Sequence, residues 1–399
     1  MDFRTIYDYN FCNKNVLLRV DFNVPLNEQG DVTNDKRIRE TLPTIKYLQC
    51  QRAKIIILTH IGRPKKRVKE LQTDGVAHRL SQILHTYVKK IDSCIGEEAK
   101  KAIAEMKPGE VLMLENVRFY PEESANNNDF ARQLAMLADY FVLDAFGVCH
   151  RKNASVTQIA QFIPSSAGFL LQKEIETMTA LTKEPQKPFV TIIGGAKEDK
   201  IGVIHNLLPH LDYLMIGGKL ANTFLKAAGK RIGASKYDEE TLLLAEKLLK
   251  ESNKKLILPV DVIVADIFDN TAETHAVSVD EIPEAWMAVD IGPQTRELYS
   301  SLIKDAATIV WAGPIGVFEI DKFSAGTKHI AEAIAQSRGI TIIGGGDSAA
   351  AVEQFHVAHY MSLVSTGGGA SLELLQGAEL PGITALIENK KLFNELVEQ

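Results

Sequence analysis

The chain has 399 residues, of which 45% are hydrophobic and 24% are charged, and one hydrophobic core rarely serves such a length. Its formal net charge of −6 argues against a general nucleic-acid-binding protein, whose domains are usually basic. No apolar run is long enough to span a membrane and the first residues lack the pattern of a secretory signal, so we expect a cytoplasmic protein without nucleic-acid or membrane partners.

Short apolar runs recur along the chain, each followed by a polar or glycine-rich turn and then a helical pattern. Runs such as 54–59 are apolar without alternation, which is typical of strands covered on both faces. Their alternation with amphipathic stretches such as 238–249 predicts an α/β fold with parallel sheets wrapped by helices. The predicted strands are residues 16–20, 54–59, 110–114, 140–143, 189–193, 213–216, 255–258, 308–311, 340–343 and 361–365.

The two halves of the chain differ in charge. Pro164, Ser165 and Ser166 interrupt the chain before a helical stretch from Phe169, so the first domain is expected to end near residue 168. Residues 1–168 carry 24 basic and 20 acidic side chains, whereas residues 169–399 carry 21 and 31. This asymmetry indicates different roles for the two halves.

The cysteines do not indicate a disulfide scaffold. All four lie in the first half without a Cys-x-x-Cys pair, which is typical of reduced thiols. Cys149 beside His150 could be a nucleophile and its base, but sequence neighbours rarely have that geometry.

The first-half strands are followed by arginines and histidines. Ligands of parallel α/β sheets bind beyond the carboxyl ends of the strands. Guanidinium groups match phosphate and carboxylate oxygens, so we predict a small polyanionic ligand. A single arginine would more often be a solvated surface residue, but four in equivalent positions favour a site. The residues at or near these strand ends are Asp21, Phe22, Asn23, Arg37, His60, Ile61, Gly62, Arg63, Arg118 and Arg151.

The second-half strands are followed by glycine-rich loops. Glycine lets backbone amides approach phosphate oxygens, and a helix that starts there adds its positive N-terminal dipole. The glycines could simply form tight turns, but five such loops on one sheet favour a phosphate site. Asp347 and Ser348 are placed for Mg²⁺ and phosphate contacts, and Lys197 and Lys200 could neutralise a transferring group. The loops are residues 194–200, 217–219, 313–319, 344–348 and 367–371.

Other site types are less well supported. No G-x-x-x-x-G-K-[ST] string occurs, which argues against a Walker-type site. Residues 344–349 match G-x-G-x-x-A, but no carboxylate follows about twenty residues later, so a dehydrogenase is weakly indicated. His356 and His359 could resemble metal ligands, yet no third ligand is evident.

The chain resembles the phosphoglycerate kinase family from end to end. The resemblance implies two Rossmann-like three-layer domains joined by a hinge. It also implies reversible phosphoryl transfer between ATP and the carboxylate of 3-phosphoglycerate, which gives ADP and 1,3-bisphosphoglycerate, with Mg²⁺ bound to the nucleotide. The motifs that carry it are residues 19–25, 59–64, 114–119, 144–147, 194–197, 258–261, 290–293, 316–319, 344–347 and 365–373.

The resemblance also implies roles for both halves. Residues 1–168 with 383–399 would bind phosphoglycerate through the strand-end residues above, and residues 169–382 would bind the nucleotide, in a monomer. Glu319 would contact the ribose and Asp347 the Mg²⁺. The groups that would act on the transferring phosphoryl group are Arg37, Lys197, Lys200 and the backbone amides near Gly346 and Gly369. The nucleotide-binding set would be Lys197, Lys200, Gly217, Gly218, Glu319, Gly345, Gly346, Asp347 and Ser348.

Some positions depart from the family pattern. Lys197 and Lys200 are three residues apart where the family usually has four. Ala312 and Asn153 stand where the family usually has an asparagine and a histidine, and Ser348 stands where it has a threonine. These differences leave a competing hypothesis, a family relative that binds the ligands without turnover.

Overall fold

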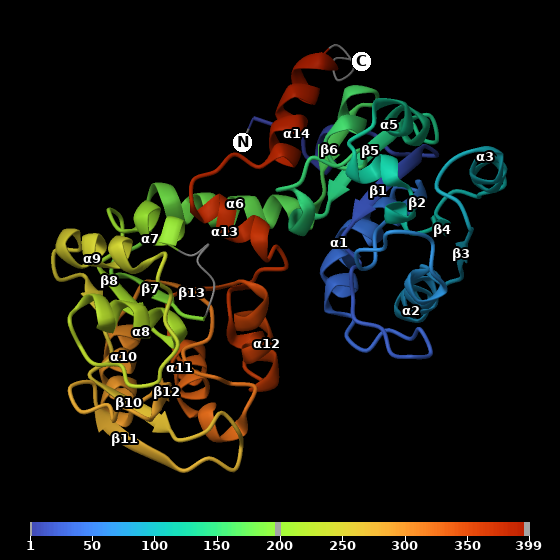
Figure 1. Cartoon of the computed structure of the whole chain (residues 1–399). Helices are drawn as coiled ribbons and strands as arrows, with labels where there is room; N and C mark the ends of the chain where they lie inside the picture. Colours follow the sequence, from blue (N-terminus) through green and yellow to red (C-terminus); the bar gives the residue numbers. More distant parts are fainter. Residues whose placement is uncertain (1, 196–200, 395–399) are drawn as a thin grey trace. The chain divides into compact units, whose positions relative to one another are not determined.

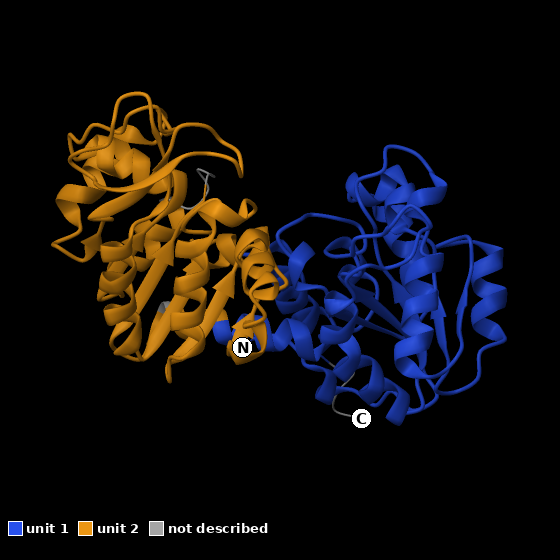
Figure 2. Ribbon diagram, turned by 90° about the horizontal axis from the view of Figure 1, so that it is seen from below, with its two compact units in different colours: residues 1–177, 379–399 blue, residues 178–378 orange. Residues whose placement is uncertain are grey.

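The computed structural model describes residues 2–195 and 201–394. The chain divides into two compact units, residues 1–177 with 379–399 and residues 178–378 (Figure 2). The change between units falls inside helix α6 (Phe169–Lys183) and again just before helix α14 (Pro381–Leu392). Each unit is described by itself below.

The first unit is built on a parallel six-stranded sheet in the order β3-β4-β2-β1-β5-β6. The central strand β1 is buried from Val16 to Val20, which explains why its residues are apolar apart from Arg19. The strands are β1 (Asn15–Val20), β2 (Lys54–Leu58), β3 (Val88–Lys90), β4 (Val111–Met113), β5 (Tyr140–Asp144) and β6 (Ser165–Ala167).

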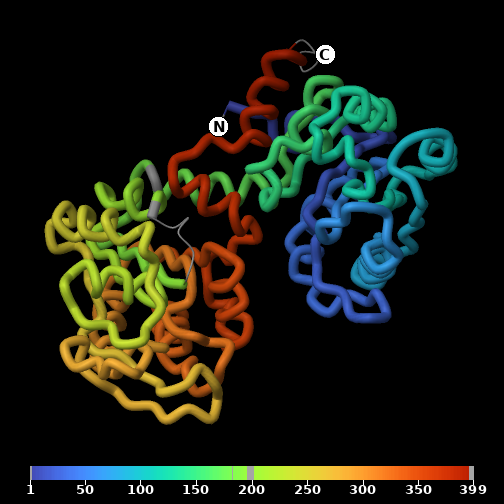
Figure 3. Tube along the Cα trace, viewed as in Figure 1, coloured from blue at the N-terminus to red at the C-terminus, as the bar shows by residue number. Residues whose placement is uncertain are grey.

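Amphipathic helices cover this sheet (Figure 1). Helix α5 buries Phe130, Ala131 and Leu134 on one stripe, and the side chain of Asn127 caps it by accepting from the Phe130 amide. The C-terminal helix α14 belongs to this unit, as the red end of the trace in Figure 3 shows. Besides α14, the helices of this unit include α1 (Lys36–Cys50), α2 (Asp74–Leu84), α3 (Glu97–Ala104), α4 (Pro121–Ser124) and α5 (Asn128–Ala135).

The second unit contains a parallel six-stranded sheet in the order β15-β14-β13-β7-β8-β9. All ten predicted strand runs coincide with strands of the two parallel sheets, so the α/β fold class is confirmed. The strands of this sheet are β7 (Phe189–Ile193), β8 (Tyr213–Ile216), β9 (Leu256–Ile257), β13 (Thr308–Ala312), β14 (Ile340–Gly344) and β15 (Leu363–Val364).

A smaller antiparallel sheet in the second unit lies outside the predicted strands. It comprises β10 (Asp261–Ala265), β11 (Thr274–Ser278) and β12 (Met287–Ile291), in the order β11-β10-β12. β11 is largely exposed or half-buried, so it lacks the continuous apolar run that marks a covered strand. The pattern that revealed the parallel strands therefore could not reveal this one.

Helices also cover the sheets of the second unit. Helix α9 begins at Leu242 rather than at the predicted residue 238, because Asp238 forms a turn in which its carboxylate accepts from the Glu240 amide. The helices are α7 (Ile201–Leu207), α8 (Gly218–Ala227), α9 (Leu242–Glu251), α10 (Pro293–Lys304), α11 (Ala325–Ala335), α12 (Gly346–Gln354) and α13 (Gly369–Leu375). Across the described residues, no helix is both long and apolar enough to cross a membrane.

Candidate active site

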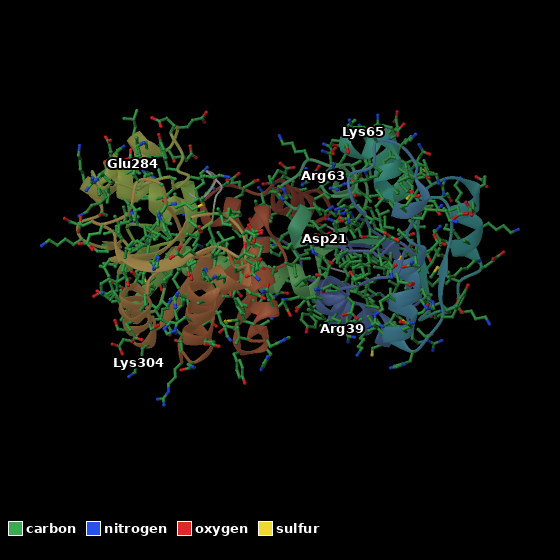
Figure 4. The ribbon with its side chains drawn as sticks, turned by 60° about the horizontal axis from the view of Figure 1, so that its bottom comes forward. Asp21, Arg39, Arg63, Lys65, Glu284 and Lys304 are labelled. Atoms are coloured by element: carbon green, nitrogen blue, oxygen red, sulfur yellow. The ribbon has the colours of Figure 1, made fainter. Side chains whose placement is uncertain are left out.

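The predicted cationic side chains of the first unit gather at one edge of its sheet. Asp21 follows β1, His60 follows β2 and Arg118 lies in a 3-10 turn (Val117–Phe119) that follows β4. Because all strands of the sheet are parallel, their carboxyl ends meet at this edge. Figure 4 marks Asp21 and Arg63 on this unit.

Asp21 lies in a group of polar side chains at the ends of β1 and β2. Its carboxylate forms an ion pair with Arg37, and its Oδ1 lies 3.8 Å from Nδ1 of His60. Asn23 Oδ1 accepts from the Gly62 amide at 2.8 Å. The interactions fix the carboxyl ends of β1 and β2 against each other.

The electrostatics of this group confirm that its charges lie close together. The pKa of His60 is well below its usual value, first because the ring is buried and then because Arg19 and Arg118 are near. Burial in the first place, and then the nearby Arg151, lower the pKa of Arg118 to about 10. His60 is therefore neutral at physiological pH, and the positive charge of the site is carried by arginines.

Little of this positive charge is neutralised internally. Across residues 2–195 and 201–394, the predicted arginines form one ion pair, that of Arg37 with Asp21, and the neutral His60 ring 3.8 Å from Asp21 adds none. Arg63 is exposed and Arg118 is half-buried. An excess of guanidinium groups around one carboxylate is a surface that a small polyanion can neutralise.

Two predicted residues have their side chains turned into the core. Phe22 is fully buried and Ile61 is 2% exposed. Only their backbone groups are available to a ligand, and the Phe22 amide already donates to Thr59 Oγ1 at 3.0 Å.

Arg19 is a residue of this site that the strand-end pattern missed. It is 1% exposed, its Nε donates to Ser155 Oγ at 2.9 Å, and one terminal nitrogen lies 3.4 Å from His60 Nδ1. The buried Glu123 accepts from the same Ser155 hydroxyl at 2.6 Å. An arginine within an apolar strand was the available signal, since buried charges are rare unless paired.

The loop after β5 does not support a cysteine nucleophile. Cys149 is fully buried and burial raises the pKa of its thiol. His150 Nε2 accepts from Arg151 Nε at 3.2 Å instead. Asn153, at the position where the family usually has a histidine, points inward and donates to the Glu123 carbonyl at 3.1 Å.

The second unit contains a cavity of about 540 Å³, and three of the predicted nucleotide-binding residues line it: Gly218, Glu319 and Asp347. Asp347 is exposed in the first turn of α12, and Gly218 is the first residue of α8. A helix N-terminus with its free amides is a site for anions. Lys219, Pro314 and Val317, from the predicted glycine-rich loops, also line it, whereas Asn222, Lys236 and Phe268 are lining residues that the sequence did not single out.

Other predicted nucleotide-binding residues do not line this cavity. Gly345 has φ +87° and precedes α12, while Gly346 and Gly369 are the first residues of α12 and α13. Gly217 and Ser348 are buried. The Ser348 hydroxyl accepts from the Gly313 amide and donates to the Gly344 carbonyl at 2.9 Å, so it braces two loops from within.

Asp290 is a buried carboxylate in the cavity lining. Its Oδ2 accepts from the Gly326 amide at 2.5 Å and from Arg296 at 3.2 Å. Burial raises its pKa to about 7, more than these contacts lower it. The side chain joins β12 to the start of α11 beneath the cavity.

Lys197 and Lys200 lie outside the described residues. Among the residues that are described, no cluster of three or more His, Cys, Asp or Glu side chains could hold a metal ion. Asp347 is a single exposed carboxylate at a helix N-terminus. Mg²⁺ is commonly bound by one or two carboxylates together with substrate phosphates and water, so this donor fits a metal that arrives with a nucleotide.

Comparison with known protein sequences points to a single family. The family model described as Phosphoglycerate kinase matches residues 6–378. Phosphoglycerate kinase of Moorella thermoacetica is 51% identical over 389 residues, which cover 96% of this chain and 99% of that protein. The enzyme of Herpetosiphon aurantiacus is 50% identical over 391 residues, which cover 97% and 99%.

Solved structures agree. Phosphoglycerate kinase from Coxiella burnetii superposes with a TM-score of 0.87 and 41% identity, over 97% of this chain and 99% of that one. The enzyme from Pyrococcus horikoshii superposes with a TM-score of 0.88 and 34% identity, over 98% and 100%.

Proposed function

The chain belongs to the phosphoglycerate kinase family, and on that premise we propose which of its residues hold each substrate. The chain is a kinase that transfers a phosphoryl group reversibly between ATP and the carboxylate of 3-phosphoglycerate, a step of glycolysis. The relatives give no support to the alternative of a ligand-binding protein without turnover.

We propose that the first unit binds 3-phosphoglycerate or 1,3-bisphosphoglycerate at the carboxyl edge of its sheet. The observation that carries this proposal is the set of arginines near this edge, of which Arg37 pairs with Asp21 and the half-buried Arg118 donates to the Gly62 carbonyl. Planar guanidinium groups suit both the phosphate and the carboxylate of the substrate. The residues assigned to this site are Asp21, Phe22, Asn23, Arg37, His60, Ile61, Gly62, Arg63, Arg118 and Arg151.

The second unit is assigned to ATP or ADP. Gly218, Glu319 and Asp347 line a cavity within the size range of small-molecule sites, with Glu319 proposed for the ribose and Asp347 for Mg²⁺. Bound Mg²⁺ supplies charge neutralisation to the nucleotide phosphates. Lys197, Lys200, Gly217, Gly345, Gly346 and Ser348 complete the proposed set, with Ser348 acting through its backbone because its hydroxyl is engaged.

The proposed chemistry depends on position and charge. The attacking carboxylate is ionised near neutral pH, so no general base is required. Phosphoryl transfer passes through a loose, in-line transition state, in which Arg37, Lys197, Lys200 and the amides of Gly346 and Gly369 would neutralise charge. Because the two substrates are assigned to different units, transfer requires the units to close about a hinge.

A pair of variants tests this division, each serving as the control of the other. Arg118→Ala is expected to weaken 3-phosphoglycerate binding by about tenfold or more and to leave ATP binding unchanged, because it removes one charge-assisted contact. Glu319→Gln is expected to weaken ATP binding alone. Isothermal titration of each ligand checks both, and a loss of ATP affinity in Arg118→Ala would contradict the assignment.

Three further properties are the location, the oligomeric state and the partners of the protein. We propose a cytoplasmic monomer without nucleic-acid or membrane partners. Sedimentation equilibrium at several concentrations would test the monomer.

A further inference from the structure

The loop that follows β2 carries Arg63, and one buried side chain ties its two ends together. Asn116 is fully buried after β4. Its Nδ2 donates to the carbonyl of Ile61 at 2.9 Å and to that of Leu71 at 2.8 Å. A single amide group therefore closes the segment 61–71.

The neighbouring Glu115 anchors the same loop at other points. It is fully buried, and its Oε1 accepts from the amides of Thr73 at 3.1 Å and Asn116 at 2.8 Å. Its Oε2 accepts from Arg67 in the loop and from Lys90 at the end of β3, both at 3.1 Å. The two cations offset the cost of burying the carboxylate.

The hydrogen bonds of Asn116 also hold the backbone near Arg63 and Arg118, two residues proposed to bind the substrate. Asn116 Oδ1 accepts from the Arg118 amide at 3.1 Å, and an Arg118 guanidinium nitrogen donates to the Gly62 carbonyl at 2.5 Å. Gly62 immediately precedes Arg63. The side chain of Asn116 thus holds the backbone at Ile61, two residues before Arg63, and at Arg118 itself.

We propose that Asn116, anchored by Glu115, is a positioning residue for phosphoglycerate binding. The inference rests on the proposed substrate roles of Arg63 and Arg118. Residues 65–67 and 69–70 of the loop are exposed like Arg63, and Figure 4 marks Lys65 near it, so little packing limits the conformations of this segment. Binding to an unordered loop would carry the entropy of ordering it, and the closure removes that cost in advance.

The test uses Asn116→Ala and Asn116→Asp in the full chain. The aspartate keeps an acceptor for the Arg118 amide but offers no hydrogen to Ile61 and Leu71. Both variants are expected to raise KM for 3-phosphoglycerate by about tenfold or more, since small misplacements of binding groups have large effects. KM for ATP is expected to stay within about twofold, because that site is assigned to the other unit.

Asn389 provides a matched control in the same unit. It is buried, its Nδ2 donates to the carbonyls of Ala160 at 2.5 Å and Ile163 at 2.8 Å, and its Oδ1 accepts from the Ser165 amide. Asn389→Ala removes the same kinds of bond from a region without proposed ligands. It is expected to lower Tm as Asn116→Ala does while KM for 3-phosphoglycerate stays unchanged.

A second pair of variants avoids the buried position, in case the Asn116 variants do not fold. Arg67→Ala removes the loop anchor to Glu115, and Lys66→Ala removes an equal charge from the same exposed segment while that anchor stays in place. The KM of Arg67→Ala for 3-phosphoglycerate is expected to be about three times that of Lys66→Ala.

The outcomes are distinguished by Arg63→Ala. If Arg63→Ala raises KM and adding Asn116→Ala raises it no further, Asn116 acts through Arg63 and the proposal stands. If Arg63→Ala raises KM while the Asn116 variants, or Arg67→Ala relative to Lys66→Ala, do not, the positioning role is overturned and the substrate site survives. If neither Arg63→Ala nor Arg118→Ala changes KM, the proposed site fails and this inference fails with it.

Discussion

The loops at the carboxyl ends of the two parallel sheets differ in chemistry. In the first unit they present arginines whose charges are close enough to shift one another's pKa, as Arg151 does for Arg118. In the second unit they present glycines such as Gly218 and Gly346 at the first turns of helices. The first arrangement supplies full charges, and the second supplies backbone amides.

The arginines and the backbone amides need different structural support. Like charges repel, so the arginines require a buried framework of hydrogen bonds such as those of Asn116 and Glu115. Backbone amides are already held in place by the helix, and glycine, which lacks a Cβ, leaves room for a ligand to approach them. The second half of the chain can therefore be strongly acidic overall and still be assigned to an anionic nucleotide, because local amides rather than net charge attract it.

The largest expected effect tests the charged arrangement. Arg37→Ala should lower kcat by about 100-fold or more, since a charge that stabilises the transition state is removed, while ATP affinity changes little. Arg39→Ala is the control on the same helix, because Arg39 pairs with Asp35 whereas Arg37 pairs with Asp21. Figure 4 marks Arg39 and Asp21. Steady-state kinetics with both substrates measures the effect, and equal losses in the two variants would contradict the role of Arg37.

The next effect tests the glycine arrangement. Gly218 has φ +60°, and a Cβ there would lie 2.6 Å from the Gly195 nitrogen. Gly218→Ala should reduce the free energy of unfolding by about 1–3 kcal/mol and weaken ATP binding, because backbone must shift at the cavity. Gly229→Ala is the control: Gly229 has φ +78°, but a Cβ there would meet no atom within 4 Å, so this variant introduces backbone strain without a steric clash. Denaturation and ATP titration measure both, and equal behaviour of the two variants would refute the steric argument.

The buried carboxylate below the cavity predicts a pH dependence of stability. With its pKa raised to about 7, Asp290 stays protonated in the folded chain while the unfolded chain releases the proton near pH 3.8. Its stabilising contribution is complete below that value and is lost as pH rises to about 7, by on the order of 1.4 kcal/mol per pH unit. Asp290→Asn should therefore gain stability relative to the unsubstituted chain over this range, as measured by urea denaturation.

If the difference in free energy of unfolding between Asp290→Asn and the unsubstituted chain stays constant from pH 4 to 7, Asp290 is ionised in the folded state. Asp144 in the first unit, whose pKa burial also raises to about 7, provides the comparison. Asp144→Asn should show the same trend in stability without an effect on ATP binding.

The smallest expected effect concerns His60. Since its pKa is well below the usual value, it is neutral from pH 6 to pH 8. His60→Gln should weaken 3-phosphoglycerate binding by only about threefold, the loss of one neutral hydrogen bond, and by the same factor across this range. A difference that grows toward pH 6 in titration calorimetry would show that the imidazole is charged.

Much of the parallel architecture was readable from the sequence. Runs such as 54–59 and 189–193 do not alternate between apolar and polar residues because both faces of those strands are covered, and they became β2 and β7. The antiparallel strand β11 was not readable, because its side chains are mostly exposed and its position depends on pairing with β10. The edge strands β3 and β6 were missed because each has only three residues, Val-Lys-Lys and Ser-Ser-Ala, and neither forms an apolar run.

The sequence by itself determined the α/β class, the family and the chemical types at the strand ends. Only the tertiary structure decided how those side chains are used: Arg19 and Asn116 became internal supports, and the Ser348 hydroxyl turned away from the proposed ligand. The physical reason is that periodicity reports which face of an element is covered. The partner of a buried polar group lies on a distant segment and is fixed only when the segments pack.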